Sequence, residues 1–309
     1  MSESTAVLAA VLSSALGGGA AAATRFAISS TDPVTLAAFR FGVGFVFLLP
    51  VALLRNSRWP TGRDWVGVSL LGLLFFAVFF VLYNLSLTYT TAARGTLALS
   101  TLPLLTMVVA ALFRIEPLTR RKSAGVLIAM GGVAVSLATG LTDAPAGAWR
   151  GDFVMLVGAL CMALYNVWSR PFITRSGPLP FTTAGMGAGA ACLVLITWWN
   201  DGFVVANRFG TAQWAAIIYL GAFGSALTFY LWGFALERTT PTRVANTITV
   251  NPVMAAIVAA ILLGEPLGAN LMIGMTAVFA GIWIASTHAK PQSIGLEPNR
   301  RKAGDGKLS

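Results

Sequence analysis

The sequence is divided into long apolar runs, each close to the length that crosses a lipid bilayer. A transmembrane helix needs about 20 mostly apolar residues, because its backbone polar groups must be paired within the helix. The connections between runs are too short for a soluble domain, so we expect an all-α polytopic membrane protein with ten transmembrane helices. We place the runs near 6–27, 33–54, 65–88, 95–113, 121–140, 151–170, 180–199, 213–236, 244–262 and 269–288.

Composition supports a membrane partner and excludes several other classes. Only 10% of the residues are charged, whereas soluble domains have about 25%. The net charge of +10 lies in short gaps between the apolar runs, so it does not form the basic surface of a nucleic-acid-binding protein. With one histidine, His288, and two cysteines inside apolar runs, the sequence predicts no metal site and no cofactor.

An internal repeat with a spacing of 149 residues adds a second constraint. The run "PLLTMVVAALFRIEPL" begins at Pro103, and "PVMAAIVAAILLGEPL" begins at Pro252. We therefore expect two copies of one five-helix unit, at 6–140 and 151–288, followed by a disordered basic cytoplasmic tail at 289–309. The same shift pairs Trp65 with Trp214, Gly72 with Gly221, Phe80 with Phe229 and Arg94 with Arg243.

The odd number of helices in each copy predicts that the two copies are inverted in the membrane. A unit with five crossings enters from the opposite side the second time, which relates the copies by a pseudo-two-fold axis in the membrane plane. If the N-terminus is cytoplasmic, the inner segments hold sixteen Lys and Arg and the outer segments hold four. Because basic loops stay inside, both termini are expected in the cytoplasm.

No acidic residue is expected at mid-membrane depth. All eleven Asp and Glu fall at helix ends, in loops or in tails. A proton-coupled pump usually has a titratable carboxylate or histidine within the membrane. The sequence therefore argues against carboxylate-based proton coupling.

Arg40 lies about two helical turns into the apolar run 33–54, in "AAFRFGVG". It could face a cavity, where a guanidinium group would hold a carboxylate. It could also extend to the outer interface, or bond to helix-end carbonyls, as long basic side chains do.

Pro103 and Pro252 are expected to kink their helices at repeat-equivalent places. A proline inside a helix leaves the carbonyl four residues earlier, here that of Leu99 or Ile248, without its usual donor. Such a carbonyl beside a cavity could accept a substrate ammonium, or a neighbouring side chain could satisfy it; the kinks would also suit helices that move during gating. The polar residues near them, also candidates for substrate binding, are Ser100, Thr101, Asn246 and Asn251.

A further set of aromatic and amide residues lies deep in the apolar runs. Such residues suit a cavity for a small ligand with an apolar body and polar ends. Near a helix end, the same aromatic residues would form an interfacial belt. The candidates are Tyr83, Asn84, Tyr165, Asn166, Trp168 and Tyr230.

These patterns resemble the EamA module of the drug/metabolite transporter superfamily. The resemblance rests on "YNLSLTYTTAARGTLALSTLPLLTMVVAALFRIEPLTRRKSAGVLIAMGG" and on its second copy around "NPVMAAIVAAILLGEPL". It implies ten helices in two inverted repeats, the export of small metabolites, and a role for Arg40 that the second copy lacks. The wider sequence also resembles the YddG branch of amino acid exporters, which implies a bacterial inner-membrane location.

The predicted function is export of a small metabolite, most simply an aromatic or other neutral amino acid, by alternating access. A multidrug exporter of the same superfamily is the nearest alternative, and a nucleotide-sugar carrier would need more cavity cations. A membrane enzyme is not expected, because no catalytic dyad or phosphate-binding loop is visible. A non-transporting scaffold would have no use for paired kinks, and the pattern fits a monomer and a dimer equally.

Overall fold

The structure is a computed structural model that describes most of the predicted helical region. The expected helices near 121–140 and 269–288, and the 289–309 tail, lie wholly or largely outside the described residues. The described ranges are 3–55, 58–116 and 146–264, with the short pieces 123–124, 127–128, 131 and 276.

Within the described ranges the chain is helical, and eight helical spans are long and apolar enough to cross a membrane. They coincide with eight of the ten predicted runs, and the second span begins and ends where it was predicted. The multi-pass membrane architecture is therefore confirmed. The spans are Ser4–Ser30, Pro33–Leu54, Asp64–Tyr89, Ala92–Leu112, Ala148–Ser176, Pro178–Trp199, Thr211–Arg238 and Pro241–Leu263.

The first four spans contain six α-helices. Helix α2 begins after Asp32, whose carboxylate accepts hydrogen bonds from the backbone N–H groups of Val34 and Thr35. This N-cap satisfies donors that have no partner within the helix. The helices are α1 (Glu3–Ala27), α2 (Pro33–Leu54), α3 (Asp64–Gly72), α4 (Phe80–Tyr89), α5 (Ala92–Leu99) and α6 (Leu102–Leu112).

The last four spans of the described chain repeat this arrangement. Thr91 caps α5 by accepting from the N–H of Arg94, and Thr240 caps α12 by accepting from that of Arg243. The two caps are 149 residues apart, which is the spacing of the sequence repeat. The helices are α8 (Ala148–Ser176), α9 (Pro178–Trp199), α10 (Thr211–Gly221), α11 (Thr228–Arg238), α12 (Pro241–Asn246) and α13 (Asn251–Leu263).

Two spans contain a π-helical segment that the sequence pattern did not predict. The segment Leu73–Phe79 joins α3 to α4, and Ala222–Leu227 joins α10 to α11. Their first residues are again 149 positions apart. A π-helical turn is wider than an α-helical turn and is frequent at functional sites, and both segments here lead directly into cavity-lining residues.

The two repeat prolines start new helices and do not kink continuous ones. Pro103 lies in the first turn of α6 and Pro252 in the first turn of α13. Proline is tolerated there, because a first-turn N–H has no acceptor within the helix. A 3₁₀ segment, Thr247–Val250, precedes α13, and the carbonyl of Ile248 accepts the N–H of Asn251. The expected unpaired carbonyl is therefore absent at Ile248.

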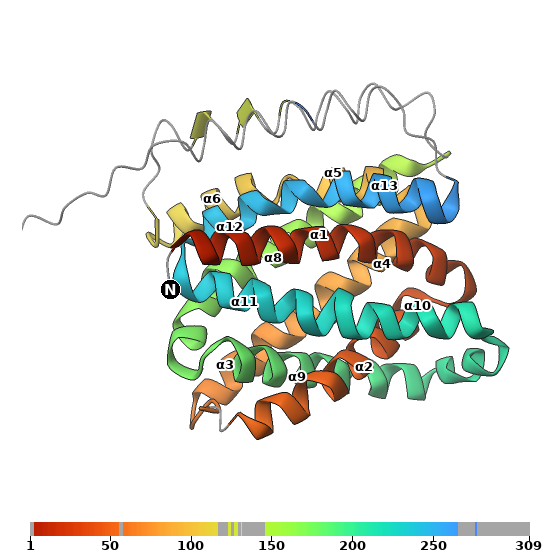
Figure 1. Cartoon of the computed structure of the whole chain (residues 1–309), viewed down its shortest axis with the longest axis horizontal. Coiled ribbons are helices and arrows are strands. Elements are labelled where there is room, and N and C mark those ends of the chain that lie inside the picture. Colours follow the sequence, from red (N-terminus) through yellow and green to blue (C-terminus); the bar gives the residue numbers. More distant parts are fainter. Residues whose placement is uncertain are drawn as a thin grey trace, which may run out of the picture.

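The helices lie side by side along the long axis of the molecule (Figure 1). α1 packs against α11 and α13, while α8 packs against α4 and α6. α2 packs against α9 and α10. An aromatic cluster that includes Phe41, Phe75 and Phe229 fills the space between these helices.

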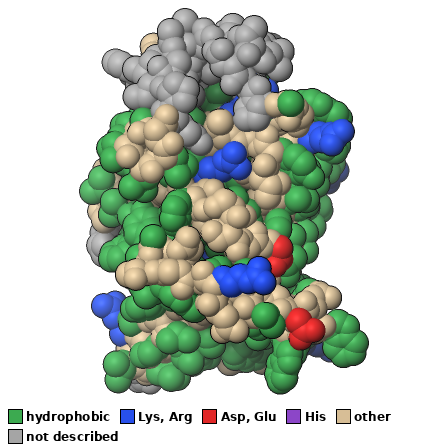
Figure 2. All heavy atoms as spheres, turned by 90° about the vertical axis from the view of Figure 1, so that its right-hand side faces the viewer, with side chains coloured by type: hydrophobic (Ala, Val, Ile, Leu, Met, Phe, Trp, Pro, Cys, Tyr) green, Lys and Arg blue, Asp and Glu red, His purple; other side chains and the backbone are tan. Residues whose placement is uncertain are grey.

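Apart from Arg40, the charged side chains of the described residues lie toward the ends of the bundle. Figure 2 views one end and shows scattered basic and acidic side chains among uncharged ones, with apolar side chains at both edges. At the end of the bundle where α5 and α8 begin, Arg94 pairs with Asp152 at 2.6 Å. The apolar flanks are what a lipid-facing surface requires.

Candidate functional site

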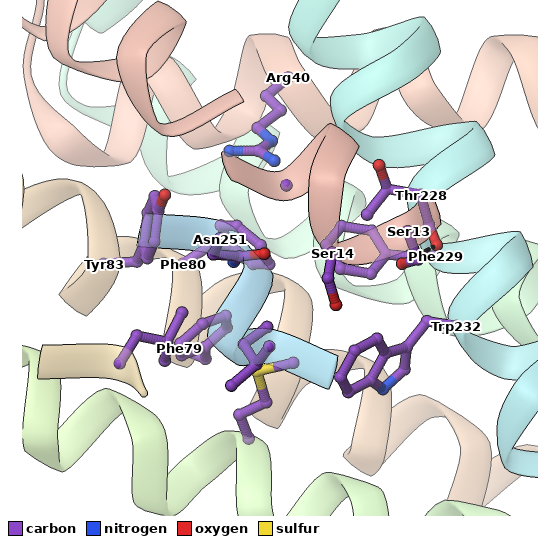
Figure 3. Close-up of a pocket in the computed structure, with 14 residues that line it drawn as sticks. Ser13, Ser14, Arg40, Phe79, Phe80, Tyr83, Thr228, Phe229, Trp232 and Asn251 are labelled. Carbon is purple, nitrogen blue, oxygen red and sulfur yellow. Dashed lines mark hydrogen bonds between the residues drawn. The ribbon is translucent and has the colours of Figure 1, made fainter. Parts of the chain in front are cut away.

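A cavity lies in the middle of the bundle, where α1, α2, α4, α8, α11 and α13 meet (Figure 3). Its free volume in this conformation is about 40 Å³, which is room for a few water molecules, so a larger ligand requires the lining helices to move apart. The polar residues that line it are Ser13, Ser14, Arg40, Tyr83, Thr228 and Asn251. The main apolar ones are Phe79, Phe80, Met162, Phe229 and Trp232.

Arg40 is buried in the wall of this cavity and does not extend to the membrane surface. Its side chain is 2% exposed. Its Nε donates to Ser225 Oγ at 2.8 Å, its Nη1 to Thr24 Oγ1 at 3.3 Å, and its Nη2 to the carbonyl of Gly224 at 2.6 Å. The structure thus combines features of the two alternatives open from the sequence, because Arg40 lines the cavity and also bonds to a backbone carbonyl.

The π-helical segment Ala222–Leu227 explains how a backbone carbonyl is available to Arg40. In a π-helical turn the usual α-helical hydrogen bonds are displaced, so some carbonyls accept from side chains instead. Gly224 lies in this segment and accepts from Arg40, while the carbonyl of Phe223 accepts from Thr228 Oγ1 at 2.7 Å. The irregular backbone thus fixes the position of the guanidinium group.

The Arg40 guanidinium retains capacity to bind a ligand. A guanidinium has five N–H donors, and three hydrogen bonds involving Arg40 are present within the described residues. No described carboxylate pairs with it, and it lies 4.6 Å from the centre of the Phe80 ring. A buried cation with spare donors and no counter-ion attracts an anionic group such as a carboxylate.

Asn251 offers an acceptor in the same cavity. It is 4% exposed, and its Oδ1 has no hydrogen-bond partner among the described residues. Gly17 of α1 allows this close packing, because a Cβ there would lie 3.3 Å from Asn251 Nδ2. An unpaired amide oxygen beside a cavity suits a ligand that donates hydrogen bonds, such as an ammonium group.

Trp232 lies across the cavity from Arg40 (Figure 3). Its Nε1 donates to Asn166 Oδ1 at 2.9 Å, and both side chains are buried. This bond fixes the indole ring in one orientation. The cavity therefore has a cation opposite a rigid aromatic surface, with Ser13, Thr228 and Phe229 on one side of Figure 3.

Three of the candidates from the sequence line this cavity: Arg40, Tyr83 and Asn251. Five further candidates are buried but do not line the cavity. Asn84 Nδ2 donates to the carbonyl of Pro33, and Tyr165 stacks on Phe75 with ring centres 4.1 Å apart. The remaining members of this group are Ser100, which bonds to the carbonyl of Thr96, Thr101, which is buried, and Asn166, which supports Trp232.

Trp168, Tyr230 and Asn246 are not brought to the cavity. Trp168 is 37% exposed and lies edge-on to Phe113. It follows Met162 by six residues, a rotation of about 120° away from the cavity-facing side of α8. Tyr230 lines a different pocket at one end of the bundle, and Asn246 is half-buried at the end of α12.

Several cavity residues were not predicted from the sequence. Ser13 Oγ donates to the carbonyl of Thr228 at 2.8 Å, and Ser14 Oγ lies 3.0 Å from Thr247 Oγ1. The signal that could have found them was a pair of adjacent hydroxyls in the first apolar run. Phe79, Phe80 and Phe229 carried no such signal, because phenylalanine is common on lipid-facing surfaces as well.

A bundle of membrane-length helices around a central cavity of mixed polar and aromatic character is the architecture of a membrane transporter. The chain belongs to the EamA-like transporter family, whose model matches residues 4–138 and 149–287. This confirms the resemblance to the drug/metabolite transporter superfamily that the sequence motifs indicate.

Relatives that are named as transporters cover most of the chain. A probable terminal-alkyne amino-acid exporter from Streptantibioticus cattleyicolor is 28% identical over 92% of this chain and 94% of its own. The uncharacterized transporter YyaM of Bacillus subtilis is 24% identical over 85% of this chain and 87% of its own. A solved crystal structure at 20% identity matches with a TM-score of 0.70 over 92% of this chain and 98% of that chain, which establishes the shared fold.

Proposed function

We propose that this transporter exports small neutral amino acids, with aromatic ones among them. One observation carries the proposal: a buried arginine with spare donors and no described counter-ion faces a cavity lined by aromatic rings. The substrate carboxylate would bind Arg40, the ammonium group would bind near Asn251, and the side chain would lie against Phe79, Phe229 and Trp232. The similar exporter from Streptantibioticus cattleyicolor carries an amino-acid substrate in its name, which supports the same class.

The proposed mechanism is alternating access by two inverted five-helix repeats. Three features support it. First, α1 packs against α11 and α13, and α8 packs against α4 and α6, which are the repeat equivalents of α11 and α13. The other two are the paired caps at Thr91 and Thr240 and the paired π-helical segments. The ten-helix count, the repeat boundaries, the cytoplasmic termini and the bacterial inner-membrane location belong to this proposal. Helices of the two repeats would tilt about the cavity and expose it to one side at a time.

Transport is proposed to run without carboxylate-based proton coupling. Within the described residues no acid lines the cavity. Glu116 is buried, but its carboxylate accepts the backbone N–H of Thr242 at 3.2 Å near one end of the bundle. Efflux would then follow the gradient of the substrate itself.

The test is counterflow in proteoliposomes loaded with unlabelled amino acids. We expect labelled phenylalanine or another neutral amino acid to accumulate transiently, and a lipophilic cationic dye to give no signal, because Arg40 repels cations. Accumulation of the dye alone would favour the multidrug alternative. No counterflow of any amino acid or dye, with the protein correctly inserted, would favour a scaffold and contradict the proposal.

Pro252 is expected to affect the rate of exchange more than the yield of protein. It fixes the break between α12 and α13, beside cavity residues Ile248 and Asn251. In Pro252→Ala the missing N–H is restored and a continuous helix becomes possible, which removes a flexible joint. We expect counterflow to slow about threefold to tenfold at similar expression. This corresponds to an increase of about 1 kcal/mol in the barrier to exchange.

The matched control for this prediction is Pro50→Ala. Pro50 also lies inside a helix, but it is exposed near the end of α2 and does not line the cavity. Its replacement should leave the exchange rate unchanged. Equal exchange rates in Pro252→Ala and the parent protein would remove the proposed role of this joint.

A further inference from the structure

A second pocket lies at one end of the bundle, apart from the central cavity. It is formed where α2, α8 and α11 end and α9 begins, toward the left-hand end of Figure 1, where the N-terminus lies. Four of its lining residues are arginines and one is an acid: Arg55, Arg58, Arg175, Arg238 and Glu237. Its empty volume, including space open to solvent, is about 860 Å³.

The pairing of these charges leaves two arginines in excess. Arg175 donates to both carboxylate oxygens of Asp64, at 2.8 and 2.9 Å, and Arg238 pairs with Glu237. Arg55 and Arg58 have no carboxylate partner among the described residues. Two unpaired guanidinium groups in one pocket attract an anion, and their planar donors match a phosphate.

The start of α9 adds to the positive potential of the pocket. Gly177 precedes this 22-residue helix with φ of +81°, and no side chain caps it. Pro178 and Pro180 have no N–H, so the first turn offers the N–H of Leu179 and the positive end of the helix dipole. Tyr230 lines the same pocket, and its hydroxyl group is a further donor.

The surroundings of the pocket are apolar and exposed, as at a bilayer surface. Leu53 and Leu54 directly precede Arg55 and are 61% and 86% exposed. Trp59, directly after Arg58, stacks with Trp65, their ring centres 6.3 Å apart. Tryptophan pairs at helix ends lie at the level of lipid headgroups. An anion bound here would have an apolar helix flank beside it.

We propose that this pocket binds the phosphate headgroup of an anionic phospholipid. Arg55, Arg58 and the start of α9 would hold the phosphodiester, and the acyl chains would lie along the exposed end of α2. Basic pockets between transmembrane helices at the membrane surface bind headgroups in this way. The site is separate from the transport cavity, so it stands or falls independently of the proposed cargo.

The experiment is native mass spectrometry of the detergent-purified full chain with phosphatidylglycerol or phosphatidylcholine of identical acyl chains. We expect the parent protein to retain phosphatidylglycerol at least fivefold better than phosphatidylcholine. In the double variant Arg55→Ala/Arg58→Ala this preference should disappear. Soluble glycerol phosphate at millimolar concentration should not displace the lipid, because it lacks the acyl chains.

A charge-matched control is Arg150→Ala/Arg208→Ala, which removes two exposed arginines outside the pocket. It should keep the lipid preference of the parent protein. Loss of the preference in both double variants would mean that only total charge matters, and would overturn the proposal. Equal retention of phosphatidylglycerol by the parent and by Arg55→Ala/Arg58→Ala would overturn it as well. Displacement by glycerol phosphate would also overturn it, because the pocket would then bind a soluble phosphate.

The conservative double variant Arg55→Lys/Arg58→Lys should keep part of the preference for phosphatidylglycerol. Loss of the whole preference in a monodisperse preparation of this variant would also count against the site.

Discussion

Replacing Arg40 with methionine is expected to reduce amino-acid counterflow about a hundredfold or more. Methionine has a similar length but no charge, so the substrate carboxylate would enter the cavity without a cation. A hydrogen bond to a charged group contributes about 1.5–3 kcal/mol, and each 1.4 kcal/mol corresponds to about tenfold in affinity. Loss of two such bonds accounts for the expected effect. The measurement is the initial rate of counterflow at several substrate concentrations in proteoliposomes.

Arg40→Lys distinguishes the charge from the geometry of the guanidinium. A lysine keeps the cation but cannot make the planar set of bonds to Ser225, Thr24 and the carbonyl of Gly224. We expect it to recover part of the rate, with a raised KM. The control Arg208→Ala, at an exposed position, should transport like the parent protein. Normal transport by a correctly folded Arg40→Met would falsify the assignment of this residue to substrate binding.

For the Arg40 variants, thermal stability must be measured together with transport. Without Arg40 the carbonyl of Gly224 loses the side-chain donor that it has within a buried segment, at an expected cost of about 1–3 kcal/mol. Ser225→Ala removes one bond to the Arg40 side chain and leaves the charge in place. A melting temperature lowered in Ser225→Ala, together with transport that is only mildly slowed, would separate the structural contribution from substrate binding.

The fold was more predictable than the cavity, and the reason is physical. Membrane helices need an apolar length that can be read directly from the sequence, so the run predicted at 33–54 coincides with α2. The bond that ties the π-helical segment Ala222–Leu227 to α2 was not predictable, because it joins residues far apart in the chain. Arg40 donates to the carbonyl of Gly224, which is 184 residues away. Sequence reasoning alone therefore left two positions open for this arginine.

The predictions for the cavity depended on which side of each helix faces inward. Tyr83 and Asn251 line the cavity as expected, while Trp168 and Tyr230 do not. In a membrane protein the lipid-facing and inward-facing sides are both apolar, so hydrophobic periodicity does not identify the inner side. Polar pairs such as Ser13 and Ser14 are the better guide, because lipid offers them no hydrogen-bond partner.

Replacing Gly72 with alanine is expected to reduce the yield of folded protein to a small fraction of that of the parent. A Cβ at Gly72 would lie 2.2 Å from the carbonyl oxygen of Gly185, where α3 meets α9. The obstacle is backbone, which cannot rotate away, so the two helices would have to separate along their contact. We expect a loss of at least about 3 kcal/mol of stability, as for severe overpacking, seen as aggregation or absence of a monodisperse peak in fluorescence-detected size-exclusion chromatography.

Gly221, the repeat equivalent of Gly72, and Gly42, which has free space around it, form a graded series with Gly72. At Gly221 an added Cβ would lie 2.3 Å from Cγ1 and 2.6 Å from Cβ of Val43, a stiff side chain, while the nearest backbone atom, the carbonyl oxygen of Arg40, is 3.2 Å away; at Gly42 nothing lies within 4 Å. Gly221→Ala should therefore lower the melting temperature by less than Gly72→Ala, and Gly42→Ala should be neutral or slightly stabilising, because alanine favours a helix by up to about 1 kcal/mol. If all three variants behave alike, the close contact between α3 and α9 does not limit folding. If proximity to backbone atoms sets the cost of the added methyl group, the loss of stability must be largest at Gly72, smaller at Gly221 and smallest at Gly42.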